Sequence, residues 1–339
     1  GPSGLSAAFY LSIMGHDVTV FEQRHRLGGM LRYGIPAYRL PREALDHEID
    51  VLKTTGFKTK TDISIGKDIS LAELDQNFDA LYVSIGAHND RKIGIEGEDA
   101  NGVMSAVEML REIGDEHMPD FTNQRICVIG GGNVAMDVAR SSIRLGAKSV
   151  QIIYRRRQID MTALPEEVEG AIADGCEIME LYAPGRIEKD ADNNVTAFIA
   201  VPQIVGAIKW GRPTPVKAHQ EEVRIPCDKV IVAIGQGIDS QSFGDFGIPI
   251  ERGRLQAFDT SEVKNKAGIF AGGDCVTGPA TVIRAIAAGK VAAANIDEYL
   301  GYEHEINSSV DIPRIRFDDH QPCGRVNMKE RPASERIHD

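Results

Sequence analysis

The feature that most constrains this chain is a glycine turn between an apolar run and a helical run. The apolar run covers residues 126–129, and Gly130, Gly132 and Ala135 follow at the spacing G-x-G-x-x-A. The first glycine permits the tight bend, the second lets backbone approach a pyrophosphate, and the small third residue lets helix and strand pack closely. The pattern predicts a dinucleotide site at a helix N-terminus, with a ligand-free glycine turn as the alternative.

The residues that end the next strand indicate which dinucleotide binds. An NAD or FAD site usually has Asp or Glu there, accepting a hydrogen bond from the ribose 2′-hydroxyl. This chain has Tyr154 followed by Arg155, Arg156 and Arg157. Guanidinium groups can pair with a 2′-phosphate, which a carboxylate would repel. The sequence therefore predicts NADP(H). A solvated basic loop is the alternative, and which arginines make the contact is left open.

A second copy of the unit opens the chain. Gly1 to Gly4 match the last four positions of a G-x-G-x-x-G turn, and the strand after the next helix ends in Glu22. Glu22 stands where the central unit has Tyr154. The copy at the start of the chain therefore keeps the acid suited to a free 2′-hydroxyl, as in FAD. A surface carboxylate is the alternative role. The first glycine and its strand are missing from this copy, so we expect a portion of a longer polypeptide.

Loops between these units supply further candidate flavin contacts. Gly28 and Gly29 can bring backbone close to a ligand, and the apolar strand at 78–86 ends in Gly86, where backbone can approach again. The loop that holds Gly28 and Gly29 is either a cofactor cover or a plain connector. Arg39 is the candidate for stabilising a reduced, anionic flavin, unless it is an ordinary salt-bridging arginine.

A last glycine-rich segment precedes an alanine-rich helix. An apolar strand runs into Gly273 and Asp274, and the helix begins near Thr281. Asp274 can accept from a ribityl hydroxyl. The helix N-terminus at Thr281 and Val282 can face the part of a flavin where negative charge gathers on reduction. Beyond Ile306 the chain turns polar and arginine-rich, which predicts an extended tail against another domain or subunit.

Two glutamates after the arginines raise the question of acid–base catalysis. Thr162 stands where it would cap a helix, Pro165 falls in the first turn, and Glu166 and Glu167 follow. Carboxylates at a helix start are favoured by the helix dipole, so we assign both to helix electrostatics.

The remaining pattern predicts the other elements. Expected helices cover 5–14, 42–54, 103–113 and the run from the glycine turn to 145, and expected strands cover 18–21, 150–153 and 230–235. Residues 175–229 read as a β-rich extension with a hairpin around Trp210.

Composition excludes several classes of protein. A formal charge of −12 argues against a nucleic-acid partner. No apolar run is long enough to span a membrane, and no signal peptide opens the sequence. The five cysteines include no C-x-x-C, so neither a redox disulfide nor a metal or iron–sulfur ligand set is predicted, and a reducing cytoplasm fits best.

Taken together, the segments resemble the flavoproteins of the glutamate synthase small-subunit type. The motifs are GPSGLSAAFYL, VTVFE, VIGGGNVAMDVAR, YRRR, LPEEVE and GIFAGGDCVTGPATVIRAIAAGK. The NADPH half of dihydropyrimidine dehydrogenase and the large subunit of NADH-dependent ferredoxin:NADP oxidoreductase resemble it too. The resemblance implies an α/β fold of two Rossmann-like domains, glutathione-reductase-like, with an NADP(H) domain at 105–248 inserted in a FAD domain at 1–104 and 249–305. Residues 306–339 would be a tail or linker.

The resemblance also implies which residues bind each cofactor. The FAD contacts would be Gly1, Gly4, Glu22, Gln23, Gly28, Gly29, Arg39, Gly86, Gly273, Asp274, Thr281 and Val282. The NADP(H) contacts would be Gly130, Gly132, Asn133, Val134, Arg155 and Arg156.

The expected activity is hydride transfer between NADP(H) and FAD. Because no C-x-x-C is present, electrons would leave to iron–sulfur centres of another domain or subunit, with ferredoxin as one candidate, and a thioredoxin-reductase-like activity is disfavoured. The alternative is a non-catalytic scaffold subunit of a redox complex that has lost FAD.

Overall fold

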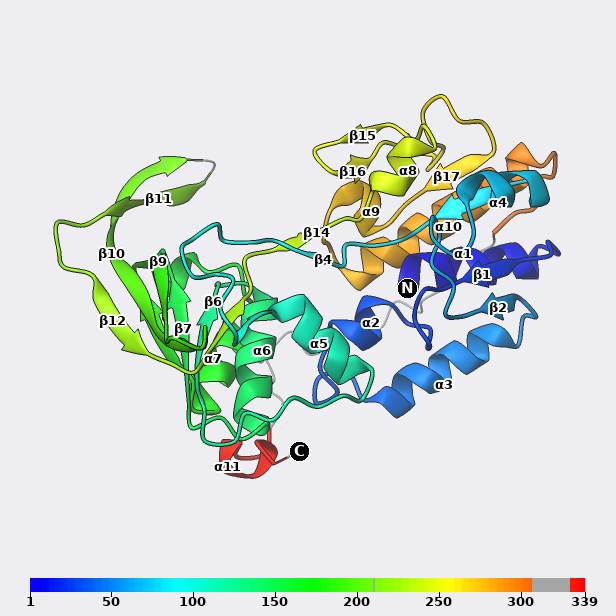
Figure 1. The fold of residues 1–339 in the computed structure, drawn as a ribbon. Helices are drawn as coiled ribbons and strands as arrows, with labels where there is room; N and C mark the ends of the chain where they lie inside the picture. Colours follow the sequence, from blue (N-terminus) through cyan, green and yellow to red (C-terminus); the bar gives the residue numbers. More distant parts are fainter. Residues whose placement is uncertain (210, 307–329, 339) are drawn as a thin grey trace, which may run out of the picture.

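The structure is a computed structural model that describes residues 1–209, 211–306 and 330–338. These residues form two lobes (Figure 1). The lobe drawn mainly in green contains the central glycine turn. The other lobe joins the beginning of the chain, in blue, to the segment drawn in orange. Both lobes combine helices with parallel strands, so the predicted α/β fold is confirmed.

A five-stranded parallel sheet forms the centre of the green lobe. The strand order is β5-β13-β6-β7-β8, and every neighbouring pair is parallel. The strands are β5 (Val103–Ser105), β13 (Lys229–Val232), β6 (Arg125–Ile129), β7 (Ser149–Tyr154) and β8 (Glu177–Glu180). Because β6 and β7 are parallel neighbours, the glycine turn after β6 and the arginines after β7 leave the same edge of the sheet.

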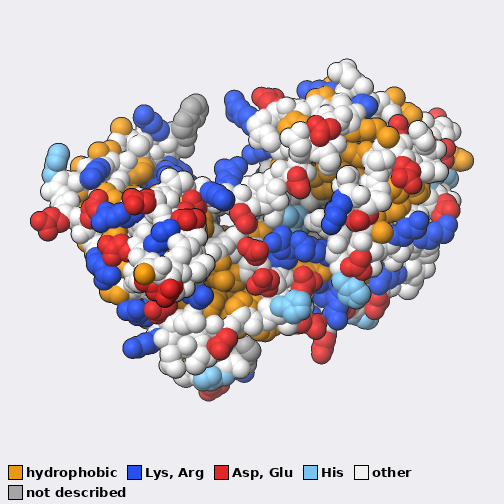
Figure 2. Space-filling model, in the orientation of Figure 1, with side chains coloured by type: hydrophobic (Ala, Val, Ile, Leu, Met, Phe, Trp, Pro, Cys, Tyr) orange, Lys and Arg blue, Asp and Glu red, His pale blue; other side chains and the backbone are white. Residues whose placement is uncertain are grey.

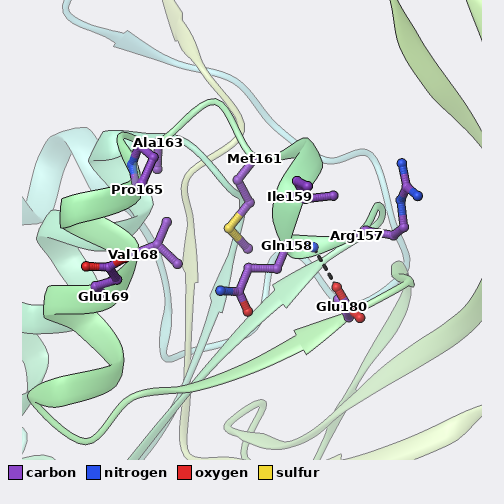
Figure 3. Close-up of a pocket in the computed structure, with 9 residues that line it drawn as sticks. All are labelled: Arg157, Gln158, Ile159, Met161, Ala163, Pro165, Val168, Glu169 and Glu180. Carbon is purple, nitrogen blue, oxygen red and sulfur yellow. Dashed lines mark hydrogen bonds between the residues drawn. The ribbon is translucent and has the colours of Figure 1, made fainter.

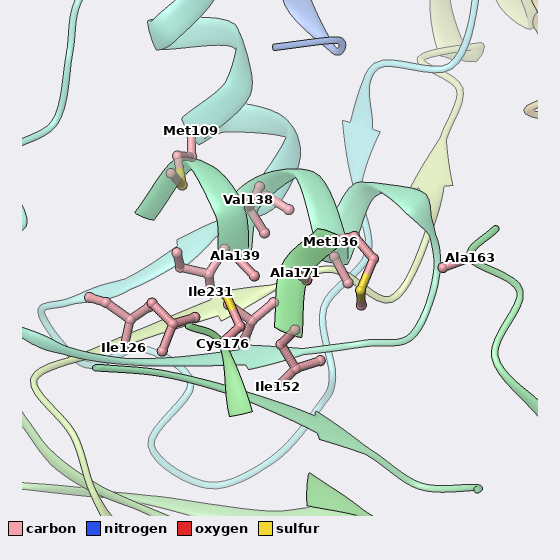
Figure 4. Packing of buried hydrophobic residues seen from close by; sticks show 14 of the residues in the cluster. Met109, Ile126, Met136, Val138, Ala139, Ile152, Ala163, Ala171, Cys176 and Ile231 are labelled. Atoms are coloured by element: carbon pink, nitrogen blue, oxygen red, sulfur yellow. The ribbon is translucent and has the colours of Figure 1, made fainter. Parts of the chain in front are cut away.

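The side chains of β6 alternate between two cores. Ile126 and Val128 face α5 (Ala106–Gly114), α6 (Asn133–Arg144) and α7 (Pro165–Ala173), and Figure 4 shows part of that packing. Cys127 and Ile129 face the opposite side. There they pack on an antiparallel sheet of β9 (Tyr182–Lys189), β10 (Val195–Lys209), β11 (Arg212–Lys217) and β12 (Val223–Pro226). The period of two in burial is what a strand buried on both faces requires.

The segment at 103–113 differs from the expected helix. Val103 to Ser105 form strand β5, which pairs with β13, and α5 begins only at Ala106. Ser105 caps that helix, because its Oγ accepts hydrogen bonds from the backbone N–H groups of Val107 and Glu108. The β-branched Val103 favours a strand, and Ser105 favours the N-cap position, so the helix begins only after them.

Two helices pack closely in the other lobe. Helix α1 (Pro2–Ile13) lies against α10 (Val282–Tyr299), where a Cβ on Gly289 would come 2.2 Å from the carbonyl oxygen of Ser3. Only glycine permits that approach. Two parallel strand pairs flank these helices: β1 (Thr19–Phe21) with β2 (Lys58–Lys60), and β3 (Leu81–Val83) with β17 (Ile269–Ala271).

A short antiparallel pair lies where the chain crosses between the lobes. It consists of β4 (Asn89–Asp90) and β14 (Gln236–Gly237), and Figure 1 shows it between the two lobes. The remaining elements are α2 (Met30–Tyr33), α3 (Arg42–Lys53), α4 (Leu71–Asn77), η1 (Gln158–Asp160), α8 (Gln241–Asp245), β15 (Ile250–Glu251), β16 (Arg254–Leu255), α9 (Asp274–Thr277) and α11 (Ala333–Arg336).

Helix α11 corrects part of the expected tail. Residues 333–336 are helical rather than extended, and Arg336 Nε donates to Asp174 Oδ1 at 2.9 Å, so this end of the tail lies against the chain's own green lobe. Residues 307–329 of the tail, and Trp210 in the expected hairpin, lie outside the described residues.

Candidate functional site

The glycine turn after β6 is pressed between two parts of its own lobe. A Cβ on Gly130 would lie 2.3 Å from the carbonyl oxygen of Ala233, and one on Gly131 would lie 2.5 Å from the ring of Tyr154. At Gly132, the N-cap of α6, a Cβ would meet only Thr162 Oγ1, at 3.5 Å. Packing therefore requires glycine at positions 130 and 131, whereas Gly132 leaves the N-terminus of α6 accessible.

A segment that sequence reasoning did not connect with this turn folds against it. The backbone N–H groups of Thr162 and Ala163 donate to the carbonyl oxygen of Gly131, at 3.0 and 3.1 Å. Asn133 Oδ1 accepts from the N–H of Leu164 at 2.9 Å. The expectation that Thr162 caps α7 is wrong, because the N-cap is Leu164 and the Thr162 hydroxyl faces Gly131.

The two glutamates of the LPEEVE segment stand where the helix dipole favours them. Glu166 and Glu167 both lie in the first turn of α7, as predicted.

Val134, the residue after Asn133 in α6, is half-buried. It packs on the core between the parallel sheet and its helices.

The three arginines after β7 have different partners. Arg156 Nε donates to the carbonyl oxygen of Pro213 at 2.7 Å, and Arg157 pairs with Asp160 at 2.9 Å. Arg155 is exposed and has no hydrogen-bond or ion-pair partner within the part of the chain that the structure describes. Of the three guanidiniums, that of Arg155 is therefore the one with no partner among the described residues, while Arg156 is held through Nε and Arg157 through its ion pair.

A fourth cation, missed in the sequence, reaches the same place from β11. Arg212 donates to the hydroxyl of Tyr154 at 2.7 Å and to the carbonyl oxygen of Asp160 at 2.6 Å. It lies 58 positions from Tyr154 in the chain, so no local pattern could have indicated it.

A cavity of about 520 Å³ adjoins the arginines (Figure 3). Its polar lining comes from Arg157, Glu169 and Glu180, and Gln158 closes one side through its N–H bond to Glu180. With one guanidinium against two carboxylates, this cavity does not have the charge of a phosphate site. Its apolar wall is made by Ile159, Met161, Ala163, Pro165 and Val168.

In the blue and orange lobe, the candidate residues converge on the N-terminus of α1. A Cβ on Gly29 would come 2.5 Å from the Cα of Gly1, and Gly29 has a φ of +54°. A Cβ on Gly273 would come 3.0 Å from the Cβ of Ser3, and one on Gly4 would come 2.6 Å from Ser84 Oγ. The loops that contain Gly29, Ser84 and Gly273 therefore meet at the start of α1.

Glu22 lies beside the same helix end. Its Oε2 is 3.9 Å from the Gly1 nitrogen, and its Oε1 accepts from the N–H of Arg24 at 2.9 Å. The side chain is 14% exposed, which leaves it partly open to a ligand hydroxyl. Gln23 next to it is exposed, and Gly28 is buried.

Gly86 brings in a histidine that the sequence reading passed over. A Cβ on Gly86 would lie 3.0 Å from His88 Nε2. Burial, followed by nearby positive charges that include Arg24 and Arg111, lowers the pKa of His88 to about 4. His88 is therefore neutral at pH 7 and can offer one donor and one acceptor.

The start of α10 is open to solvent. Thr281 caps the helix by accepting from the N–H of Arg284 at 3.4 Å, and Asp274 Oδ1 accepts from the N–H of Ala280 at 3.1 Å. Burial raises the pKa of Asp274, against the hydrogen bond from Ala280, which lowers it. Val282 and Ile283 are 37% and 79% exposed, so an apolar surface stands beside the helix N-terminus.

Arg39 makes its contacts across the lobes. Its Nη1 atom donates to both oxygens of Asp137, at 2.8 and 2.9 Å, and its Nη2 atom lies 2.8 Å from Glu167 Oε1. Of the two interpretations of Arg39, the salt-bridging one is therefore favoured. Asp137 belongs to α6, and burial raises its pKa to about 6, although Arg39 works in the opposite direction.

Glu167 also belongs to an ionic cluster within the green lobe. Arg140 binds Glu167 at 3.0 Å and Asp174 at 2.9 Å, and Arg144 binds Asp174 at 2.9 Å. The ring of Tyr38, from the loop of Arg39, has the two guanidiniums over it at 5.0 and 4.0 Å from its centroid. The loop at 38–39 is thereby tied to the helix that begins at the glycine turn.

The surface is notched between the lobes, with Lys and Arg side chains on both sides of the notch (Figure 2). The four described cysteines, Cys127, Cys176, Cys227 and Cys275, are all buried and free. Cys323 lies outside the described residues. Among the described helices, none has the length and apolar character that a membrane crossing requires.

Comparison with known sequences gives one consistent picture. The profile of the pyridine nucleotide-disulphide oxidoreductase family matches residues 1–289. The chain is 38% identical over 304 residues to the NADP(+)-dependent formate dehydrogenase subunit beta of Moorella thermoacetica, covering 88% of this chain and 43% of that protein. It is 32% identical to the NADPH-Fe(3+) oxidoreductase subunit beta of Geobacter sulfurreducens, covering all of this chain and 55% of that one.

The resemblance to the glutamate synthase small-subunit type is confirmed. The glutamate synthase [NADPH] small chain of Escherichia coli is 32% identical over 323 residues, covering 88% of this chain and 67% of that protein. The chain spans about half the length of the first two relatives, 43% and 55%.

Solved structures share the fold. FprA of Mycobacterium tuberculosis, in complex with NADPH, superposes with a TM-score of 0.76 at 19% identity, covering 89% of this chain and 83% of that one. Thioredoxin reductase of Lactococcus lactis gives a TM-score of 0.66 at 21% identity, covering 88% and 96%. At these identities the likeness establishes the two-lobed architecture alone.

Proposed function

This chain belongs to the family of pyridine nucleotide-disulphide oxidoreductases, and from that premise we propose that it passes hydride between NADP(H) and FAD. The observation that supports this most is the contrast between two turn-and-helix units of one fold. One unit ends its second strand in Glu22, and the other places Arg155, which has no partner among the described residues, at the corresponding edge. A carboxylate suits a free ribose and a guanidinium suits a 2′-phosphate.

The glycine-lined end of α1 fits FAD. Gly1, Gly4, Gly29 and Gly273 offer backbone without side chains around one helix N-terminus, which is the surface that a pyrophosphate needs. The N-terminus of α10, capped by Thr281, is another positive helix end in this lobe, and we assign it with Val282 to the flavin. A bound flavin would cover the exposed apolar residues Val282 and Ile283.

The N-terminus of α6 fits NADP(H). Gly132 caps the helix with only Thr162 Oγ1 within 4 Å of its Cβ position, and Asn133 fixes the segment that follows the arginines. We assign the 2′-phosphate to Arg155, with Arg156 as its neighbour. Arg212, on β11, orients Tyr154 and the backbone at Asp160 through its two hydrogen bonds.

Gln236 marks the junction where the two cofactors would meet. Its Nε2 atom is buried and finds no hydrogen-bond partner among the residues described, and its strand pairs with the one that follows His88. A buried amide without a partner is costly, so a ligand carbonyl or ribose at this point would satisfy it.

Bound FAD would take two electrons as hydride from NADPH and release them singly. The chain's own residues bind and orient, since a hydride step requires no side-chain acid or base. The sequence has no C-x-x-C, and the adjoining pair Cys127 and Cys227 is fully buried in the core of the green lobe, so among the described residues no accessible thiol pair is placed to accept the electrons. We therefore propose an acceptor outside this chain, an iron–sulfur domain or subunit, with ferredoxin as one candidate.

We retain the division into a FAD domain at 1–104 and 249–305 and an NADP(H) domain at 105–248, adjusted so that Val103 and Met104 join the second. Both residues pair with β13 in the five-stranded sheet. The relatives named as subunits of formate dehydrogenase and glutamate synthase suggest a role inside a larger redox assembly.

The experiment is a cofactor titration of the full chain. Purified protein is mixed with FAD, freed of excess flavin and titrated with NADPH or NADH without oxygen. We expect retained FAD whose visible absorbance is bleached by NADPH, and more weakly by NADH at equal concentration. Protein that retains no FAD would contradict the proposal and favour the scaffold role.

A further inference from the structure

Three side chains that belong to neither candidate dinucleotide site converge at the C-terminal end of α1 and α10. His16 follows α1, Asp297 lies in the last turns of α10, and His304 lies in the segment after that helix. His16 Nε2 is 2.7 Å from Asp297 Oδ1, and His304 Nδ1 is 2.8 Å from the same oxygen. One ligand atom from each residue lies within 4.8 Å of the other two.

The charge at the centre of this cluster is buried. The side chain of Asp297 is 2% exposed, that of His16 is 14% exposed and that of His304 is 46% exposed. Among the described residues the two histidines are its only ion-pair partners, with no lysine or arginine beside them. A buried carboxylate needs compensation by a cation or by several hydrogen bonds.

The second carboxylate oxygen is already held in place. Asp297 Oδ2 accepts from the backbone N–H of His304 at 2.8 Å, which leaves Oδ1 directed at the two imidazoles. The ring of Tyr302 stacks on His304 and meets His16 edge-on, with centroids 5.5 and 5.3 Å apart. The donor atoms are thus oriented by a second layer of contacts, as at many metal sites.

From this arrangement we propose that His16, Asp297 and His304 form a binding site for a divalent transition-metal ion. Two imidazole nitrogens and one carboxylate oxygen suit zinc and its neighbours, and they do not suit magnesium or calcium, which prefer oxygen alone. Metal–ligand distances of about 2.0 to 2.2 Å require ligand atoms roughly 3.3 to 3.5 Å apart. The two contacts to Asp297 Oδ1, now 2.7 and 2.8 Å, would have to open, and the two imidazole nitrogens would have to lie at this spacing from each other as well. His304 is half-exposed and outside any helix, so its side chain is free to make this adjustment, and water can complete the coordination.

The site is structural in this proposal. It joins the turn after α1 to the segment after α10, and α1 and α10 are the helices whose N-termini we assign to FAD. The three ligands make no contact with the glycine-lined end of α1, so the metal takes no part in hydride transfer. Loss of the metal and loss of FAD can therefore be measured independently.

The competing arrangement has no metal. Each neutral imidazole donates one N–H to Asp297, and the cluster is then a hydrogen-bonded clip. Glutamine separates the two, because its amide keeps an N–H donor for the carboxylate while it is a poor ligand for zinc. His16→Gln and His304→Gln are therefore the informative variants. His219→Gln, at an exposed histidine outside the cluster, is the matched control.

The test measures zinc uptake by the full chain. All proteins contain Cys323→Ser, because a thiol outside the described residues could bind zinc on its own. They are stripped with a chelator, dialysed against buffered zinc ion alone, and analysed for bound metal and for Tm with and without zinc. Circular dichroism verifies that each variant is folded.

We expect one zinc per chain in the parent protein and in His219→Gln, with a rise in Tm on adding zinc. His16→Gln and His304→Gln should each lose at least nine-tenths of the bound zinc and the zinc-dependent rise in Tm. His304→Gln is the safer variant, because this half-exposed side chain is the least needed for folding. A parent protein without zinc, or glutamine variants that bind as much as the parent, would overturn the proposal.

Discussion

Arg39 donates hydrogen bonds of 2.8 and 2.9 Å to the carboxylate of Asp137. Arg39 lies in the loop before α3, and Asp137 lies on α6, the helix that begins at the glycine turn of the other lobe. Asp137 is 4% exposed and Arg39 is 26% exposed. The pair therefore fixes the position of one proposed cofactor unit relative to the other. A substitution of either residue should therefore weaken the packing between the lobes more than it disturbs either glycine turn.

Arg39→Gln should lower the free energy of unfolding by about 2 kcal/mol, because it leaves a buried carboxylate without its main cation. Urea unfolding followed by circular dichroism measures this. Arg111→Gln is the control, since the ion pair of Arg111 with Glu108, at 4.0 Å within α5, does not join the lobes. Equal losses in the two variants would show that the contact between the lobes has no special weight.

Asp137 should make stability depend on pH in a particular direction. Its pKa is raised from 3.8 to about 6, so the folded state holds this proton more tightly than the unfolded state does. The favourable contribution is thus present below about pH 4 and is lost as pH rises through about 6. Unfolding free energy of the native protein minus that of Asp137→Asn should fall across this window. A flat difference would contradict the burial that we describe.

Asp174 should behave in the opposite way. Burial would raise its pKa, but hydrogen bonds from Arg144 and Arg140 outweigh it and hold the pKa below 3.8. Its contribution is therefore complete above that value and is lost only as pH falls through the lowered pKa. Asp174→Asn should cost about 3 kcal/mol at pH 7, since it leaves the guanidiniums of Arg140, Arg144 and Arg336 without their shared partner. A loss below about 1 kcal/mol in urea unfolding would contradict this.

Arg155 should determine the preference for NADPH. Arg155→Gln should weaken NADPH about 10- to 100-fold, as expected for loss of a charge-assisted bond, and leave NADH almost unchanged. Arg157→Gln is the control, because Arg157 is already paired with Asp160. Binding is measured by calorimetry on the FAD-loaded chain with the oxidised nucleotides NADP+ and NAD+, which carry the same 2′ groups and do not reduce the flavin. Equal losses for the two nucleotides would exclude a 2′-phosphate role for Arg155.

Gly29 should be needed for FAD and not for folding elsewhere. Gly29→Ala places a Cβ 2.5 Å from the Cα of Gly1, so FAD retention should fall at least tenfold. Gly56→Ala is the control, because Gly56 also has a positive φ, +96°, but nothing lies within 4 Å of its Cβ position. Flavin content after gel filtration distinguishes them. Similar retention in both variants would argue against the close approach as the reason for glycine.

Local patterns in the sequence were sufficient for the turns and for the strands beside them. The spacing of Gly130, Gly132 and Ala135 predicts the turn, and β6 and α6 begin and end close to the expected residues. The contrast between Glu22 and Tyr154 was visible because both stand at the end of a strand. Physical rules for these features act over a few residues, so they can be read from one sequence.

Contacts between distant segments could not be read in that way. Arg39 and Asp137 are 98 positions apart, and no property of either residue names the other as its partner. Thr162 was misassigned as a cap for a related reason, since the backbone of its segment is held by Gly131, 31 positions earlier. Local capping propensity was outweighed by a tertiary contact.

The central claim is that two units of one fold hold NADP(H) and FAD close enough for direct hydride transfer. The most direct measurement is flavin reduction in a stopped-flow instrument without oxygen, using NADPH with deuterium at one or the other face of C4. The account predicts slower reduction with one of the two labelled forms and an unchanged rate with the other, because a fixed geometry presents a single face. Equal rates with both labels, or flavin that NADPH does not reduce at all, would contradict it.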